Sequence, residues 1–332
     1  MTISPSLLSL LACPACGGDV AVGEQENRLA CASCGARYPV IEEIPMLIAG
    51  VDCDHMENQF QRYWDSPEKA ALYDQKVEGD GDPFGVYNHE SEIYALETCL
   101  QERAPGMLLD AGCGNGRFLS RLPASTTGVG VDASLNLLKR TRDHGRGQHH
   151  VCCELERLPF KPGVFDTVIS CRVLQHLHEQ ERAVGEMARV LKPGGEMALE
   201  LYNFWNLKTT YKAIRQTPWL RRILNAPFRA VFNSMSPFDD WGLDHDLYNG
   251  WFQVKGWMRG FGLAQISGRG AGFGYHKYLF QPFFIDAQWL KRAPGSLKRY
   301  YQGCFDFEKR WFHLAWFRWT GEKFVIWGRK QG

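Results

Sequence analysis

The 332-residue sequence predicts an α/β fold in which a mostly parallel sheet follows a small cysteine-rich unit. Two Cys-x-x-Cys pairs lie within the first 35 residues, and short apolar segments alternate with helical ones from residue 107 onward. Such alternation is typical of parallel strands joined by crossover helices. We therefore expect four regions: a cysteine-rich unit (1–50), a helical extension (51–106), a sheet-forming core (107–202) and a C-terminal region (203–332).

The cysteine-rich unit contains the pairs Cys13-x2-Cys16 and Cys31-x2-Cys34, which are separated by 14 residues. Two turns of this kind can direct four thiolates at one tetrahedral zinc ion, as in a zinc ribbon. The paired spacing favours this interpretation over four buried cysteines or a redox Cys-x-x-Cys motif. Because four cysteines leave no open coordination position, the predicted Zn²⁺ is structural.

The sheet is predicted from short apolar runs bounded by turn residues. The expected strands are Met107–Asp110, Gly128–Val131, a weaker one near Val151, Thr167–Ser170, Glu196–Tyr202, Ala264–Ser267 and Phe324–Gly328. About 55 residues separate the last two strands, which is more than a bare fold of this class needs. We interpret them as an insertion.

A glycine-rich turn follows the first predicted strand and leads into a helix expected from about Arg117. Its glycines, Gly112, Gly114 and Gly116, would let the backbone approach a ligand closely. Asp132 closes the second strand, where a carboxylate can bind both hydroxyls of a ribose. On its own, such a turn also fits a dinucleotide-binding site.

Five segments, taken in order, resemble the class I S-adenosylmethionine (SAM) methyltransferases: DAGCGNG, GVGVD, LPF, FDTVISCRVLQHLH and RVLKPGG. A dinucleotide-dependent dehydrogenase would leave LPF and KPGG unexplained. The resemblance covers roughly 107–202. It implies a Rossmann-like seven-stranded sheet, SAM as the cofactor and methyl transfer as the activity.

The same resemblance assigns cofactor-binding residues. It implies that Asp110 and the three glycines line the methionine and ribose side, and that Asp132 with Ala133 binds the ribose. Glu154, where the family usually has Asp, would bind the adenine together with the Leu155 amide. Cys171 would lie beside the methionine portion.

The cysteine-rich unit, with its ending Tyr38-Pro39-Val40 and Ile44-Pro45, resembles a family of small zinc-ribbon methyltransferase activators. Members of that family partner tRNA and release-factor methyltransferases, which points toward RNA. Residues 1–57 carry a net charge of −6, however, whereas nucleic-acid affinity depends on Lys and Arg. A scaffold or intramolecular clamp therefore fits this unit better than an RNA-binding role.

The C-terminal region is basic and aromatic, because residues 203–332 carry a net charge of +12 and 31 of the 43 aromatic residues. Such a composition fits a packed core, an interfacial surface for anionic lipid, or a surface that stacks bases and neutralises phosphates. We expect first a small-molecule, glycan or lipid-linked acceptor, with peripheral membrane contact through this region. An RNA methyltransferase and a non-catalytic binding module are the alternatives.

Two histidines are candidate general bases: His176, after the fourth predicted strand, and His245, in an acidic segment. An acceptor that is already ionised would need neither of them. No apolar run reaches the length of a membrane span. Of the eleven cysteines, four have metal-site spacing, which favours a reducing cytoplasm over a disulfide framework.

Overall fold

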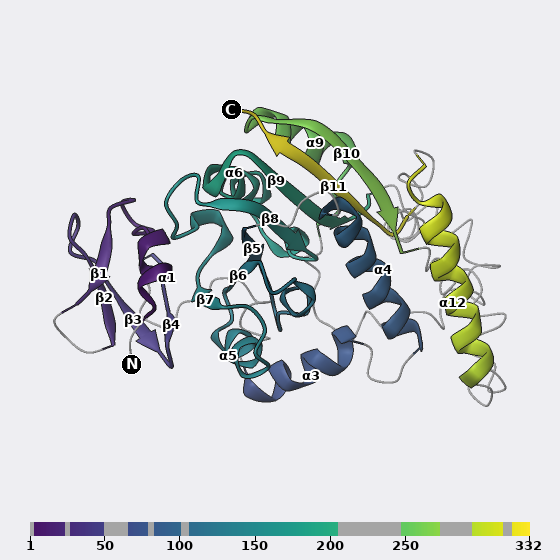
Figure 1. Cartoon of the computed structure of the whole chain (residues 1–332), viewed down its shortest axis with the longest axis horizontal. Coiled ribbons are helices and arrows are strands. Elements are labelled where there is room, and N and C mark those ends of the chain that lie inside the picture. Colours follow the sequence, from purple (N-terminus) through teal and green to yellow (C-terminus); the bar gives the residue numbers. More distant parts are fainter. Residues whose placement is uncertain are drawn as a thin grey trace, which may run out of the picture.

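The structure is a computed structural model of the chain (Figure 1). It describes residues 3–23, 27–49, 66–78, 83–100, 106–204, 247–272, 294–314 and 321–332. Within these ranges the strands form a four-stranded sheet near the N-terminus and a seven-stranded sheet in the body of the molecule. No helix in the described ranges is long and apolar enough to cross a membrane.

The N-terminal sheet has the order β1-β2-β3-β4, and each neighbouring pair is antiparallel. Its elements are α1 (Pro5–Leu10), β1 (Val20–Val22), β2 (Arg28–Cys31), β3 (Arg37–Ile41) and β4 (Ile44–Pro45). Helix α1 begins at a Ser4 cap whose side chain accepts a hydrogen bond from the Leu7 amide. We call residues 3–49 the ribbon.

The large sheet has the order β10-β11-β9-β8-β5-β6-β7. Its strands are β5 (Met107–Ala111), β6 (Thr127–Asp132), β7 (His149–Cys152), β8 (Phe165–Cys171), β9 (Leu191–Tyr202), β10 (Leu263–Ala271) and β11 (Lys323–Lys330). Strands β5 to β9 pair in parallel, whereas β11 runs antiparallel to both β9 and β10. All seven strands lie where the sequence predicts them, and the sheet confirms the predicted fold class.

Helices cover both faces of this sheet, as the parallel strands require. They are α3 (Pro67–Glu78), α4 (Pro83–Leu100), α5 (Leu135–Asp143), α6 (Gln180–Val190), α9 (Trp251–Gly260) and α12 (Pro294–Trp311). Successive residues of β5 point to opposite faces: Leu108 packs into the cluster with α4 and α5, and Leu109 into the cluster with α6 and α9. Helix α12 packs on α4, where the Tyr87 and Tyr301 rings stack at 5.4 Å.

The ribbon docks on the edge of the large sheet next to β7 (Figure 1). Met46 forms a parallel bridge with Cys152 of β7, and Leu11 forms an antiparallel bridge with Phe160. The Leu47 amide donates to the Cys152 carbonyl at 2.8 Å. Leu7, Leu11 and Leu47 share one buried apolar cluster with Phe160. Backbone pairing and apolar burial thus join the ribbon to the sheet, and this strand edge is covered.

Two sequence expectations differ from the structure or fall outside it. The helix expected from about Arg117 is wrong: a 3-10 turn, η1 (Leu119–Arg121), stands there instead. Leu122 is extended because it precedes Pro123, and proline disfavours a helical residue before it. The candidate base His245 lies outside the described residues, as does most of the aromatic segment expected to touch a membrane.

Candidate functional site

The carboxyl ends of β5, β6 and β8 lie together at one edge of the sheet, and we call this edge the crevice after the place where open α/β sheets bind their ligands. Strand β5 pairs with β6 on one side and with β8 on the other, so the chain order reverses at β5. In open α/β sheets, ligands bind outside the carboxyl ends of the strands at such a reversal. The predicted cofactor residues lie at the ends of these strands.

The glycine positions of the turn after β5 leave little room for a side chain. Gly112 has φ of 81° and Gly114 has φ of 55°, a region that favours glycine. A Cβ atom on Gly112 would lie 2.3 Å from the Val173 side chain, and one on Gly114 would lie 3.1 Å from the Tyr73 ring. Gly116 also has a positive φ, of 71°. The turn is therefore packed against the loop after β8 and against α3.

Asp132 ends β6 with its carboxylate already oriented. Its Oδ2 atom accepts from the Gly114 amide at 2.9 Å, and its Oδ1 atom accepts from the Ser134 amide at 2.9 Å. Ala133, between them, is partly buried, and its carbonyl accepts from the Cys152 thiol at 3.4 Å. A carboxylate fixed beside a glycine turn fits the predicted ribose-binding role.

The predicted adenine-binding residues follow β7. The Cys153 amide donates to the Asp132 carbonyl at 3.1 Å, which ties this segment to the end of β6. Glu154 is partly buried and precedes the 3-10 turn η2 (Leu155–Arg157), and the Leu155 side chain is buried. The crevice thus runs from the glycine turn past Asp132 toward Glu154, and these residues fit an elongated nucleoside cofactor.

Asp110, the last-but-one residue of β5, is buried at 3% exposure. Burial and the nearby Asp132 carboxylate raise its pKa to about 7, although Arg117 acts in the opposite direction. Asp110 therefore titrates near neutral pH. A cationic ligand would hold it in the ionised form.

A buried ion network lies beneath the crevice. Glu92 of α4 forms a 2.6 Å ion pair with Arg117, which follows the glycine turn, and contacts the Lys323 ammonium at the start of β11. Arg172, after β8, lies 3.6 Å from the same carboxylate. Burial alone would raise the pKa of Glu92, but Arg172, Lys323 and Arg117 hold it well below its usual range. Glu92 is therefore ionised among three cations of the described chain.

Cys171 connects this network to β9. Its thiol accepts from Arg117 Nη2 at 3.1 Å and donates to the Glu200 carboxylate at 3.3 Å. Burial raises the pKa of the Cys171 thiol and also, together with the Glu92 charge, that of Glu200. Cys171 thus lies at the carboxyl end of β8 between Arg117 and Glu200. Its predicted place beside the methionine portion of the cofactor stays a prediction.

His176 lies in the 3-10 turn η3 (Leu174–His176), shortly after β8. Burial, with a contribution from Arg172, lowers its pKa to about 3. The side chain is therefore neutral at physiological pH, but an imidazole with so low a pKa accepts a proton weakly. The roles predicted for His176 and His245 stay predictions.

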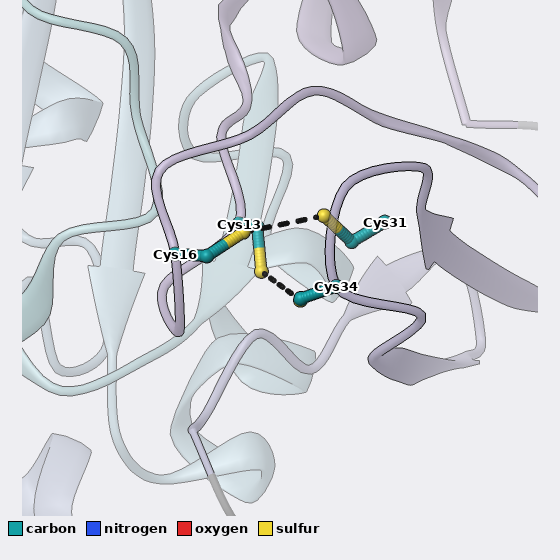
Figure 2. A group of neighbouring side chains, drawn as sticks. All are labelled: Cys13, Cys16, Cys31 and Cys34. Atoms are coloured by element: carbon teal, nitrogen blue, oxygen red, sulfur yellow. Dashed lines mark hydrogen bonds between the residues drawn. The ribbon is translucent and has the colours of Figure 1, made fainter.

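The four predicted zinc ligands converge in the ribbon (Figure 2). The sulfur atoms of Cys13, Cys16, Cys31 and Cys34 all lie within 4.8 Å of one another. Cys13 and Cys34 are 3.7 Å apart, and Cys16 and Cys31 are 3.5 Å apart. A tetrahedral Zn²⁺ with Zn–S bonds of about 2.3 Å would separate its sulfurs by about 3.8 Å, so the cluster fits zinc. The buried Tyr38 hydroxyl lies 3.0 Å from the Cys13 sulfur and supports it.

The sheet order and the site together define a class I SAM-dependent methyltransferase domain. Residues 109–199 match the family described as "Methyltransferase domain". Residues 4–43 match the family described as "Trm112p-like protein". The chain therefore contains a methyltransferase domain preceded by a Trm112p-like zinc ribbon, which confirms both resemblances and the predicted cofactors, SAM and zinc.

Curated relatives match the methyltransferase domain over part of their length. "Probable tRNA methyltransferase 9B" of Homo sapiens is 33% identical, over 39% of this chain and 29% of that protein. "tRNA (carboxymethyluridine(34)-5-O)-methyltransferase" of Arabidopsis thaliana is 37% identical, over 29% of this chain and 24% of that protein. "Malonyl-[acyl-carrier protein] O-methyltransferase" of a Methylovorus species is 33% identical, over 50% of this chain and 56% of that protein.

A solved structure shares the fold. Phosphoethanolamine N-methyltransferase 2 of Haemonchus contortus, in complex with S-adenosyl-L-methionine, has a TM-score of 0.50 and 15% identity. The likeness covers 87% of this chain and 62% of that one. At this identity it supports the fold alone.

Sequence reasoning assigned no role to Glu92, Arg117, Arg172 or Tyr73. Arg172 had one usable signal, because a charged residue directly after a predicted parallel strand lies at the binding edge of the sheet. Glu92 and Tyr73 belong to helices whose position over the crevice has no local signature. Their contacts to the site come from the tertiary structure.

Proposed function

We propose that this protein is a SAM-dependent methyltransferase whose acceptor is RNA. The observation that carries the proposal is the fixed geometry where the chain order reverses at β5: the Asp132 carboxylate accepts from the Gly114 amide, within a turn that has glycine at three positions of positive φ. SAM, when bound there, supplies an activated methyl group. The chain's own residues bind the cofactor, position the acceptor and exclude water.

Two features support RNA as the acceptor. Two of the relatives described above are named as tRNA methyltransferases, and the chain carries a ribbon of the Trm112p-like family. The net charge of +12 over residues 203–332 suits a polyanion, since Lys and Arg that neutralise phosphates drive nucleic-acid binding. These features replace the first expectation from the sequence, a small-molecule, glycan or lipid-linked acceptor.

A second candidate is O-methylation of a carboxylic acid that is not part of RNA. The relative from Methylovorus supports it, because that match covers the largest share of the three, at 50% of this chain. Its name and that of the Arabidopsis relative both specify transfer to oxygen on a group that contains a carboxyl. Both candidates use the same crevice and differ in the molecule that carries the acceptor.

Labelled methyl transfer tests the proposal. The purified protein is incubated with methyl-labelled SAM and with fractionated RNA, acyl carrier protein or small metabolites. Label should appear in RNA, disappear after nuclease digestion, and fall steeply with added salt. The variant Asp132→Ala should give none. Label confined to the RNA-free fractions would reject the RNA acceptor, and no label in any fraction would favour a non-catalytic binding module.

A further inference from the structure

Arg172 occupies an unusual place for a long charged residue. It directly follows Cys171, the last residue of β8, and has φ of 56° in the left-handed region. For a residue other than glycine, this conformation is strained, because the Cβ atom lies too close to the backbone. Such strain gathers at ligand-binding positions, where the surrounding structure holds the side chain in a required direction.

Among the described residues, the carboxyl groups that interact with Arg172 include those of Glu92 and Glu200. Besides Glu92 at 3.6 Å, the residues that interact electrostatically with it include Tyr73 from α3, Tyr202 from the end of β9, and His176. The tyrosine hydroxyls are neutral at physiological pH, and the low pKa of His176 keeps the imidazole neutral as well. Within the described part of the chain, these polar, uncharged groups share the surroundings of the guanidinium with the two carboxyl groups.

The Glu92 carboxylate is already engaged by closer cations. Arg117 lies at 2.6 Å and Lys323 is in direct contact, with side chains only 8% and 2% exposed. The Arg172 side chain, at 20% exposure, is the farthest and most open of these three described cations. Burial favours the neutral form of the neighbouring Glu200 carboxyl. The described network thus holds three cations, Arg117, Arg172 and Lys323, against two carboxyl groups, and Arg172 is the most exposed of these cations.

Arg172 lies on the side of β5 opposite to Asp132, and we call this the acceptor side of the crevice. Val173, the next residue, packs on Gly112 of the cofactor turn. Asp132, the predicted cofactor-binding carboxylate, ends β6 on one side of β5, whereas Arg172 follows β8 and Tyr202 ends β9 on the other side. A ligand on Arg172 would therefore lie next to the cofactor rather than in its place.

We propose that Arg172 binds a carboxylate of the methyl acceptor, and that this carboxylate is the group methylated. An arginine fork binds a carboxylate through two parallel hydrogen bonds, which fixes its orientation. This inference rests on the proposed function and adds to it the chemical class of the acceptor. A carboxylate acceptor would need no proton acceptor in the site, because it is already ionised.

The reaction balances without a base. A carboxylate oxygen uses one of its own lone pairs to form the bond to the methyl carbon, and the S–CH3 bond breaks with its electron pair left on sulfur. The negative charge of the acceptor and the positive charge of the sulfonium disappear together, and no proton moves. The products are a methyl ester and S-adenosylhomocysteine. Arg172 acts by holding the acceptor in line.

Two substitutions at one position test this role. Arg172→Lys keeps the positive charge and Arg172→Gln removes it, and both place a non-glycine residue at the same strained φ. The control is Arg182→Gln, which removes an exposed arginine on α6. With S-adenosylhomocysteine bound, malonate should raise the thermal stability of the wild type, of Arg172→Lys and of the control. It should not stabilise Arg172→Gln.

Kinetics and product chemistry complete the test. The acceptor is taken from the fraction that receives label from the wild-type protein. For Arg172→Gln, the KM for this acceptor should rise on the order of 10- to 100-fold, as expected for the loss of a charge-assisted hydrogen bond. The affinity for S-adenosylhomocysteine, measured by calorimetry, should stay unchanged. The label in the wild-type product should be released as methanol by mild alkali, because esters hydrolyse there and N-, C- and ether-linked methyl groups do not.

Several outcomes would overturn the inference. A loss of S-adenosylhomocysteine affinity in Arg172→Gln would assign the arginine to the carboxylate of the cofactor. An alkali-stable label would exclude a carboxylate acceptor, and a malonate response equal to that of the wild type would exclude the anion site. Failure of the proposed function looks different. The wild-type protein would then bind no S-adenosylhomocysteine, transfer no label, or place its label only in RNA-free fractions.

Discussion

The zinc site and the cofactor crevice differ in the charges that they bring together. The zinc site gathers groups of one sign, and the crevice pairs groups of opposite sign. In the ribbon, four thiolate ligands from two turns face one another, and a single dication would complete them. In the crevice, by contrast, carboxylates lie beside cations. The carboxylates come from α4 and β6, and the cations come from β11 and from the loops after β5 and β8. We expect the first site to depend on its ligand, because four thiolates within 4.8 Å repel one another without a cation. The charged groups of the second site hold one another through ion pairs and hydrogen bonds.

Removing zinc should have the largest effect of the changes considered. Cys31→Ala deprives the cluster of a buried ligand, and structural zinc contributes about 10–16 kcal/mol of apparent binding free energy in small domains. We expect loss of the bound metal, measured by metal analysis, and a large fall in the melting temperature, measured by calorimetry. Cys99→Ala, a cysteine of α4 far from the cluster in sequence, is the control. Full zinc content in Cys31→Ala would refute a four-cysteine site.

Breaking the ion network comes next. Glu92→Gln leaves Arg117 and Lys323 buried without their carboxylate, and loss of one partner from a buried pair costs about 3–5 kcal/mol. Denaturant unfolding should report a destabilisation of this size. Glu90→Gln on the same helix removes only an exposed pair with Arg121, so about 0–1 kcal/mol is expected. Equal effects from the two variants would mean that the network is not buried in solution.

Asp132→Ala should weaken cofactor binding and leave the zinc content unchanged. It removes an oriented carboxylate whose charge-assisted hydrogen bonds are worth about 1.5–3 kcal/mol each, so SAM affinity should fall by about 100-fold or more. Calorimetry with Asp143→Ala, an exposed carboxylate at the end of α5, gives the control. Unchanged affinity in Asp132→Ala would sink the cofactor assignment.

The smallest expected effect is a pH dependence from Asp110. Its folded-state pKa of about 7 lies above the unfolded value near 3.9, so its ionisation destabilises the ligand-free protein as pH rises from about 4 to 7. The cationic sulfonium and ammonium of SAM favour ionised Asp110, so affinity should rise about tenfold between pH 6 and pH 8. Asp110→Asn should flatten that profile. A steep profile that survives in the variant would assign the titration to another group.

The sequence predicts those parts of the molecule whose structure depends on residues close together in the chain. The seven strands follow from short apolar runs, and the zinc ligands follow from the spacing of two cysteine pairs. The helix expected from Arg117 fails because a proline six residues later shortens it. The contact between Glu92 and Lys323 joins residues 231 positions apart, so no local pattern could have indicated it. The acceptor side of the site depends on contacts of this second kind.

The docking of the ribbon along β7 has a consequence for behaviour in solution. Met46 and Cys152 belong to one polypeptide, so their pairing is an intramolecular event with an effective concentration set by the chain rather than by the amount of protein. Dilution cannot separate the two parts. The stability of the sheet edge, and any property of the crevice that depends on it, should therefore be the same at nanomolar and at micromolar protein.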